Sequence, residues 1–138
     1  MKLKIYIVLV SLLSGCAMQN ISNDMIGNNF INYSPVKIDL IGYYTAAMGP
    51  YLSTYEFNSD GAGKNCHVQN GNVILHRLKI YSAVNDSFEL ITETGLKSKL
   101  TRNADKTLTI NSYGQSFSLK KDRDLDVANL LCQEKLLN

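Results

Sequence analysis

From Leu40 to Lys120 the chain alternates between apolar and polar residues with a period of two, which predicts half-buried β-strands. The clearest runs lie at residues 53–57, 73–81, 88–93, 96–101, 107–111 and 115–120. Each run has one mainly apolar face and one mainly polar face, as is typical of antiparallel sheet. On the apolar face of the second run, His76 lies among Ile74, Leu78 and Ile80, and we expect it to be a hydrogen-bonded core residue.

Short turn sequences separate these runs. They are Asp60-Gly61, Asn70-Gly71, Thr94-Gly95, Asn103-Ala104-Asp105 and Tyr113-Gly114. Gly, Asn and Asp tolerate the positive φ that tight hairpins require. The pattern therefore predicts a mainly β fold: an antiparallel up-and-down meander of seven or eight strands that forms a small barrel or a sandwich.

The period changes near the C-terminus, where a helix is expected from Asp124 onward. Apolar residues then fall at helical spacing, at Leu125, Ala128, Leu131, Cys132 and Leu136. The carboxylates of Asp122, Asp124 and Asp126 suit the N-terminus of such a helix, because they complement its dipole and can cap it. This helix is expected to pack across the barrel mouth or against one face of the sheet.

The first sixteen residues form a pattern of their own. Lys2 and Lys4 precede an apolar run at 5–13, which ends in Ser14-Gly15-Cys16. The run is shorter than the ~20 residues that a membrane-spanning helix needs, and the whole pattern fits a secretory signal. The cysteine after small residues resembles the lipobox of bacterial lipoproteins. That resemblance implies cleavage before Cys16 and attachment of lipid to its sulfur and new amino group.

The resemblance also implies a location in the cell envelope. Residue 17 is alanine, whereas an aspartate after the lipidated cysteine tends to retain Gram-negative lipoproteins at the inner membrane. We therefore expect an outer-membrane protein, lipid-anchored and facing the periplasm. The domain organisation predicted is a signal peptide at 1–15, a lipidated cysteine and flexible tether at 16–39, and a β domain with a C-terminal helix at 40–138. The tether is predicted from scattered asparagines, Gly27 and Pro35.

Charge excludes one class of partner. The chain has 14 basic and 12 acidic residues. Loss of Lys2 and Lys4 with the signal peptide leaves these numbers equal. With no basic stripe, nucleic acid is not expected to bind, and attachment to the membrane has to come from the lipid on Cys16.

Cys66 and Cys132 remain once Cys16 is used for the anchor. An oxidising compartment favours a disulfide between them. Two buried free thiols are the alternative. A zinc site is not expected, because neither cysteine has a partner at CxxC spacing.

The sequence contains no recognisable catalytic set. No serine lies in a G-x-S-x-G elbow, and Cys66 and His67 point to opposite faces of a strand. We therefore expect no enzyme, no metal site and no cofactor. Four tyrosines near the start of the domain (Tyr43, Tyr44, Tyr51 and Tyr55) are a candidate interaction surface, with ordinary strand packing as the alternative.

A second resemblance covers most of the mature domain. It is carried by Ile41-Gly42-Tyr43-Tyr44, Tyr55-Glu56-Phe57, Asp60-Gly61-x-Gly63-x-x-Cys66, Leu78-Lys79-Ile80, Lys120-Lys121-Asp122 and Ala128-Asn129-Leu130-Leu131-Cys132. These segments are similar to a family of small uncharacterised Gram-negative lipoproteins, which implies no particular activity. We expect a non-enzymatic binding or interaction module with an envelope protein as partner. The alternatives are an inhibitor of a host cell-wall hydrolase and a carrier of a small apolar ligand.

Overall fold

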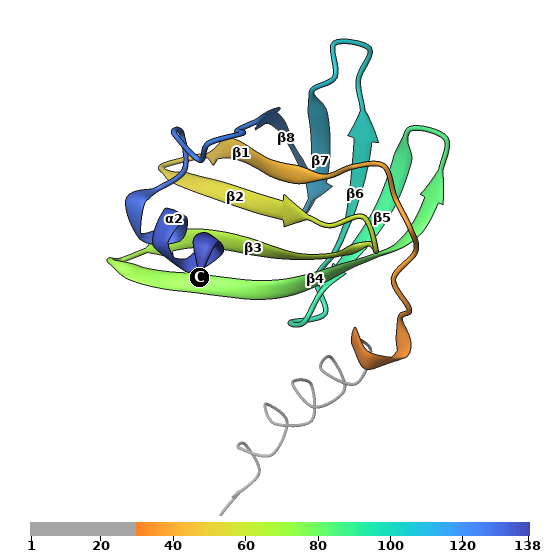
Figure 1. Cartoon of the computed structure of the whole chain (residues 1–138), viewed down its shortest axis with the longest axis horizontal. Helices are drawn as coiled ribbons and strands as arrows, with labels where there is room; N and C mark the ends of the chain where they lie inside the picture. The colour runs from red at the N-terminus through yellow and green to blue at the C-terminus, as the bar shows by residue number, and fades with distance from the viewer. Residues whose placement is uncertain (1–29) are drawn as a thin grey trace, which may run out of the picture.

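The computed structural model describes residues 30–138, which form a closed antiparallel β-barrel with a helix on its outer surface (Figure 1). The strands follow one another around the barrel in sequence order. They are β1 (Gly42–Met48), β2 (Tyr51–Phe57), β3 (Ala62–Gln69), β4 (Asn72–Val84), β5 (Ser87–Thr92), β6 (Lys97–Arg102), β7 (Leu108–Ser112) and β8 (Gln115–Lys121), followed by α2 (Leu130–Leu137). The predicted antiparallel β meander is confirmed, as a barrel rather than a sandwich. The signal peptide and Cys16 lie outside the described residues.

The hairpin turns adopt the backbone that their residues predict. Asn70 and Gly71 have φ of 52° and 76°, and Tyr113 and Gly114 have φ of 51° and 73°. Two successive positive φ values in a two-residue link are the mark of a type I′ turn, whose twist matches that of the strands. These turns lie at one end of the barrel, which we call the mouth. The β2–β3, β4–β5 and β6–β7 links lie at the opposite end, which we call the base.

The core fills the base half of the barrel. Its buried apolar side chains come from inward-facing positions of every strand but β3, where glycine and asparagine replace them. They include Tyr44, Tyr55, Phe57, Leu78, Ile80, Phe88, Leu90, Leu100, Leu108, Ile110 and Leu119. The inward positions predicted from alternation in six runs are therefore correct. β3 escaped that pattern because its inward residues are Gly63, Asn65 and His67.

Residues 30–41 form a strap that is packed onto the barrel. Leu40 is buried in the core, and Val36 and Ile38 pack against it from the base. The amide of Val36 donates to the Ile80 carbonyl at 2.9 Å, and that of Ile38 donates to the Ser59 carbonyl at 3.0 Å. The flexible tether expected at 16–39 therefore does not extend through residues 30–39, because their apolar side chains cover the base of the barrel.

The first part of the strap lies on the outer surface of β4–β6. The Lys79 ammonium donates to the carbonyls of Phe30 and Tyr33 and lies 4.4 Å from the Phe30 ring centre. Lys97 lies 4.9 Å from the Tyr33 ring centre. Ile91 pairs with both lysines in the sheet and is fully buried, although it faces outward. The strap explains this burial, because its aromatic rings lie over the lysines on either side of Ile91.

The barrel closes where β8 meets β1, and the register there joins only Tyr44 to Lys121 and Thr45 to Lys120. A buried carboxylate reinforces this short ladder. Asp122 accepts hydrogen bonds from the Thr45 hydroxyl at 2.9 Å and from the Ala128 amide at 3.0 Å, and its own amide donates to the Tyr43 carbonyl. Since Thr45 has a single hydroxyl hydrogen, the Thr54 hydroxyl must donate to Thr45 in their 2.9 Å contact. One carboxylate thus connects β1, β2 and the chain after β8.

The C-terminal helix is shorter than predicted. It begins at Leu130 rather than near Asp124, and the Asn129 side chain caps it by accepting from the Leu131 amide. Asp122 uses its oxygens on the amides of Val127 and Ala128 instead, which folds residues 122–128 into turns. Leu125 has a φ of 60°, a value that a helix excludes. The helical spacing of Leu125 and Ala128 therefore arises from turns that bury both residues.

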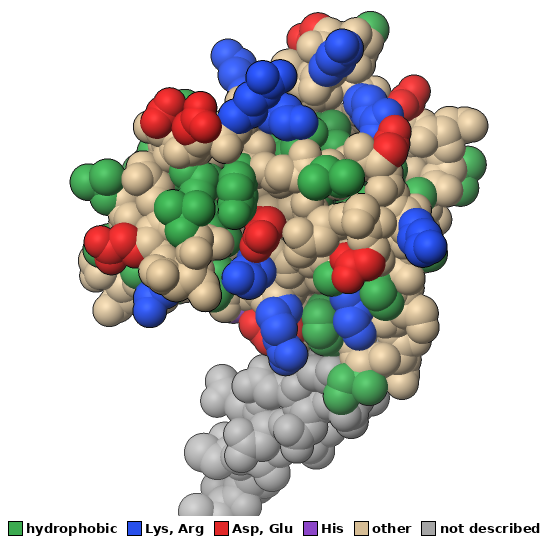
Figure 2. All heavy atoms as spheres, in the orientation of Figure 1, with side chains coloured by type: hydrophobic (Ala, Val, Ile, Leu, Met, Phe, Trp, Pro, Cys, Tyr) green, Lys and Arg blue, Asp and Glu red, His purple; other side chains and the backbone are tan. Residues whose placement is uncertain are grey.

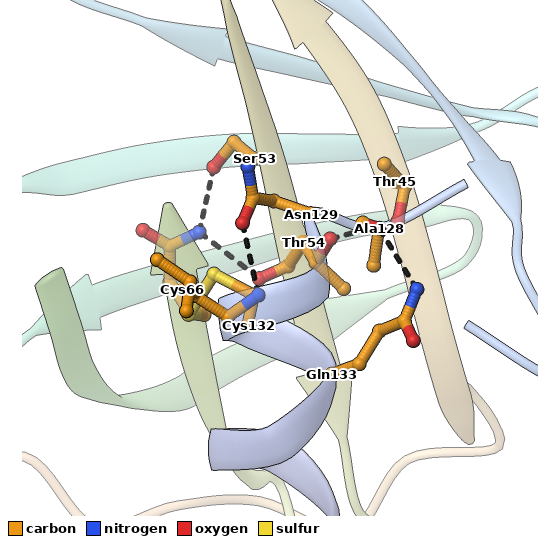
Figure 3. Close-up of a disulfide and its surroundings, with 10 residues drawn as sticks. Thr45, Ser53, Thr54, Cys66, Ala128, Asn129, Cys132 and Gln133 are labelled. Carbon is orange, nitrogen blue, oxygen red and sulfur yellow. Dashed lines mark hydrogen bonds between the residues drawn. A yellow bond between two sulfur atoms is a disulfide. The ribbon is translucent and has the colours of Figure 1, made fainter. Parts of the chain in front are cut away.

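α2 packs on the outer face of β3, where Cys132 is bonded to Cys66 (Figure 3). The disulfide lies in a second apolar cluster formed with Leu125, Ala128 and Leu136, against which Tyr43, Val68 and Val73 pack. The predicted bridge is therefore present, and the helix covers one sheet face rather than the mouth. The disulfide closes a loop of 66 residues, which corresponds to about 4 kcal/mol in the chain-entropy account of disulfide stabilisation.

Gly61 tests how closely the strap is packed against the barrel. A Cβ at this position would lie 2.1 Å from the Val36 carbonyl oxygen, whereas a Cβ at Gly71 would meet no atom within 4 Å. Both glycines have positive φ. Gly71→Ala should therefore lower the free energy of unfolding by about 1–2 kcal/mol, the cost of left-handed backbone. Gly61→Ala should lower it by at least about 2 kcal/mol more, because the strap has to move. Urea unfolding measures both, and equal losses would contradict this packing.

Asp122→Asn tests the carboxylate at the seam. The substitution replaces one accepting oxygen by an NH₂ group that faces other donors, so the free energy of unfolding should fall by about 1–3 kcal/mol. Asp124→Asn is the matched control, because Asp124 is exposed, and its effect should stay within about 0.5 kcal/mol. Chemical unfolding at pH 7 measures the difference. A tolerated Asp122→Asn would show that the ladder alone closes the barrel.

Candidate functional site

The mouth of the barrel contains two adjoining recesses with volumes of about 350 and 300 Å³. Both are lined by Tyr55, Asn65, His67, Leu96 and Tyr113, so we treat them as one site and call it the mouth site. Tyr55, Leu90 and Phe117 border the site on the side of the core. The barrel is thus filled at its base and hollow at its mouth. An eight-stranded barrel has room inside for packed side chains or for one small ligand.

Strand direction explains why polar residues collect at the mouth. In an up-and-down meander, odd-numbered strands end at the mouth and even-numbered strands begin there. The inward-facing polar residues lie at the ends of odd strands and near the starts of even ones. They are Asn65, His67, Thr92 and Ser112 from β3, β5 and β7, and Ser53, His76 and Ser98 from β2, β4 and β6.

Several of these polar side chains are joined in pairs. The Asn65 amide nitrogen donates to the Ser53 hydroxyl at 2.8 Å, and Figure 3 draws this bond as a dashed line from Ser53. It also donates to the Thr54 carbonyl at 3.3 Å. Ser98 donates to Ser112 at 3.1 Å. These bonds fix the inner wall and satisfy groups that would otherwise be costly to bury.

The two histidines of the chain meet in the mouth site, with ring centres 6.3 Å apart. Burial first, and the neighbouring His76 second, lower the pKa of His67 below its ordinary value of 6.5. The Nδ1 of His76 lies 3.9 Å from a carboxylate oxygen of Glu93, which is itself paired with Arg77. His76 was expected to be a buried core residue, and that prediction is wrong. It lies half-buried at the mouth, because β4 extends beyond the part that pairs with β5.

The four tyrosines of the candidate interaction surface do not form one surface. Tyr44 and Tyr55 are buried inside the barrel, where they pack against Phe57. Tyr43 faces outward and packs against the disulfide cluster, while Tyr51 lies exposed at the rim of the mouth. Adjacent strand residues point to opposite faces, which separates Tyr43 from Tyr44. The rim has a second tyrosine, Tyr113, which is 84% exposed at the tip of the β7–β8 turn.

The base has an open cleft of about 900 Å³ with a different character. Its lining is ionic and balanced, with Arg102, Lys106, Lys120, Lys121 and Arg123 beside Asp39, Asp105, Asp122, Asp124 and Asp126. Figure 2 shows Lys and Arg side chains gathered at the top of the view, over β7 and β8. Arg102 binds both oxygens of Asp39, at 3.0 and 2.5 Å, and this lowers the pKa of that carboxyl. Because the positive and negative charges largely compensate one another, the cleft has no excess charge that would attract an ionic ligand.

Within residues 30–138, no group of three or more His, Cys, Asp or Glu residues is arranged to hold a metal ion. Over the same residues, no helix has the length and apolar character needed to cross a membrane. The predicted lipidation site, Cys16, lies outside this part of the chain, and Cys66 and Cys132 form the disulfide.

Neither models of known protein families, nor curated proteins, nor solved structures gave a match to this chain. The assignment of the candidate site therefore rests on its geometry alone. Sequence reasoning missed Ser53, Asn65, Ser98, Ser112 and Tyr113. A signal for most of them was present: they are polar residues on the inward face of strands, all near the same end of the barrel.

The pKa of His67 provides a test of the mouth geometry. Because it is lowered on folding, the unfolded chain binds more protons just below pH 6.5. The stability contributed by neutral His67 is therefore complete above pH 6.5 and decreases as the pH falls toward its folded pKa. An NMR titration should give a midpoint below 6.5. In His76→Gln the midpoint should rise but stay below 6.5, because burial remains.

The lowered pKa of His67 also affects how the free energy of unfolding depends on pH. Between pH 7 and pH 5, His67→Gln should lose less unfolding free energy than the wild type. A wild-type midpoint at or above 6.5 would contradict the position assigned to His67.

Proposed function

We propose that this chain is a non-enzymatic lipoprotein of the outer membrane, anchored through lipid on Cys16, whose barrel binds a small ligand at its mouth. The observation that supports this most strongly is the division of the barrel interior. The base half is packed with apolar side chains, whereas the mouth half encloses a recess lined by uncharged polar and aromatic groups. Ligand sites are concave, with a few placed polar groups on a mainly apolar wall.

The chemistry of the lining favours binding over catalysis. The hydroxyls of Ser98 and Ser112 pair with each other, and Ser53 pairs with Asn65, so that none of them is held against a histidine base. Activation of a serine requires such a base within hydrogen-bond reach. The groups instead form a fixed wall of donors and acceptors, which is what recognition of a small molecule needs.

This proposal modifies the carrier hypothesis from the sequence. A lipocalin-like carrier of an apolar ligand would need an apolar cavity. The lining of the mouth site is mainly apolar, but it also presents Asn65, His67 and Ser98. An alkyl chain seated there would cover the polar atoms of the His67 ring without offering them a hydrogen bond. The ligand is therefore expected to bear polar groups of its own.

A protein partner in the envelope is the second candidate function. The surface around α2 exposes four large apolar side chains, those of Val127, Leu130, Leu131 and Leu137. Exposed apolar residues that gather on one element favour an interaction site. Crosslinking of the lipidated protein in native envelopes, with Leu130→Ser and Leu137→Ser as comparisons, tests this candidate. A single envelope protein that is captured by the wild type and lost in both variants would support it.

The anchor is tested by fractionation. Wild-type protein should be recovered with outer membranes, and Cys16→Ala should be recovered in the soluble or inner-membrane fraction, because the net charge of the mature chain offers no other attachment. Cys66→Ser with Cys132→Ser is the matched control for loss of cysteine, and it should stay with the outer membrane. Equal distribution of Cys16→Ala and wild type would overturn the lipoprotein proposal.

Ligand binding is tested by native mass spectrometry of protein released gently from envelopes. Wild-type protein should retain an additional small mass. Leu96→Trp should lose that mass, because Leu96 lines both recesses and a larger side chain would fill them. Leu137→Trp, at an exposed position on α2, is the control and should retain the mass. Retention of the mass by Leu96→Trp would place the ligand elsewhere.

A further inference from the structure

The mouth site lacks ionic side chains. Among the described residues, no Lys, Arg, Asp or Glu lines either recess, whereas the cleft at the base is lined by ten of them. Arg77 and Glu93 lie nearby but are paired with each other, with Glu93 3.9 Å from His76. A carboxylate or phosphate buried in the mouth would therefore find no fixed countercharge, and burial of an unpaired charge is costly.

Hydrogen-bonding groups are nevertheless dense there. Amides come from Asn65, Gln69 and Gln115, and hydroxyls come from serines and threonines of four strands. In addition, His67 is neutral at pH 7, because burial lowers its pKa, so its ring offers one donor and one acceptor. The lining is thus mainly apolar in area and carries several uncharged donors and acceptors, so it suits a ligand that has both apolar surface and uncharged polar groups.

The rim adds an aromatic surface. Tyr113 is 84% exposed although it borders both recesses, and Tyr51 is an exposed residue in the lining of one of them. Tyrosine provides rigid apolar area with a polar tip, and its ring face attracts the weakly positive C–H groups of a ligand. A ligand that contacts both the rim and the wall needs one apolar face and several polar edges.

We propose that the mouth site binds an uncharged, hydroxyl-rich ligand of sugar chemistry, with a pyranose ring face against Tyr113 and its hydroxyls directed at the lining amides of Gln69 and Gln115 and at the ring of His67. This inference rests on the proposed small-ligand function and specifies its ligand class. A sugar ring has the required combination, because its C–H face is apolar and its edge carries neutral hydroxyls. The two recesses, of about 350 and 300 Å³, have a combined volume within the usual range of ligand sites and can accommodate one or two rings.

Calorimetric titration of the lipidated protein in lipid nanodiscs tests the inference, with empty nanodiscs as background. The probes are N-acetylglucosamine and its β-1,4 disaccharide, glucuronate as a charged sugar, and laurate as an apolar chain. The neutral disaccharide should bind at least about tenfold more tightly than glucuronate or laurate, because neither alternative satisfies the wall without cost.

Two substitutions at Tyr113 separate stacking from folding. Tyr113→Ala should weaken binding of the disaccharide about threefold to tenfold, whereas Tyr113→Phe, which keeps the ring, should stay within about twofold. The side chain is exposed, so both variants should have the unfolding midpoint of the wild type. Equal weakening by both variants would contradict the stacking role.

The outcomes distinguish the two proposals. If laurate binds, its binding is lost in Leu96→Trp and the disaccharide does not bind, the small-ligand function holds and the sugar class is wrong. If no probe binds, and protein from envelopes retains no additional mass, both proposals fail. Tight binding of glucuronate alone would overturn the argument from the uncharged lining.

Discussion

A single buried carboxylate reinforces the closure of the barrel. β8 and β1 share only a short ladder, so backbone pairing alone leaves the last strand weakly attached. Asp122 supplies the missing connection, because its oxygens accept from Thr45 on β1 and from the amides of the turns that lead to α2. The same turns bring Cys132 to Cys66. The hydrogen bonds of one side chain therefore link the closure of the sheet to the position of the helix.

The interior of the closed barrel is divided into an apolar base and a mouth that carries polar groups. Because the base is partly covered by the strap and packed with large apolar residues, the interior at the mouth can contain hydroxyls and amides without loss of the fold. These groups are joined in pairs across neighbouring strands, which keeps the wall rigid. The division has a cost, since β3 contributes Gly63 and Asn65 where other strands contribute core residues. A residue pattern that weakens a core usually marks a functional surface.

Much of this fold could be predicted from the sequence, because period-two alternation and turn residues act locally. Tyr55 and Phe57, or Leu108 and Ile110, reveal their inward face without knowledge of their neighbours. The start of α2 could not be predicted, since the spacing of Leu125 and Ala128 also fits turns held by Asp122. The sequence predicts a flexible tether where the structure has the strap. Docking of Val36 and Ile38 could not be predicted, because it depends on an apolar base that only the assembled barrel provides. Prediction of the mouth site would have required two facts together: which strand residues face inward, and at which end of the barrel each strand begins.

The path of the chain around the barrel has a consequence for its biogenesis. The contact between Thr45 and Asp122 joins residues 77 positions apart, and the cross-link between β3 and α2 joins residues 66 apart. Contacts between distant positions form slowly and only after the later partner is available. A nascent chain that still lacks its last twenty residues can pair its early strands but cannot close them into a barrel. Late closure of this kind would keep the polypeptide open until its C-terminal segment has been made.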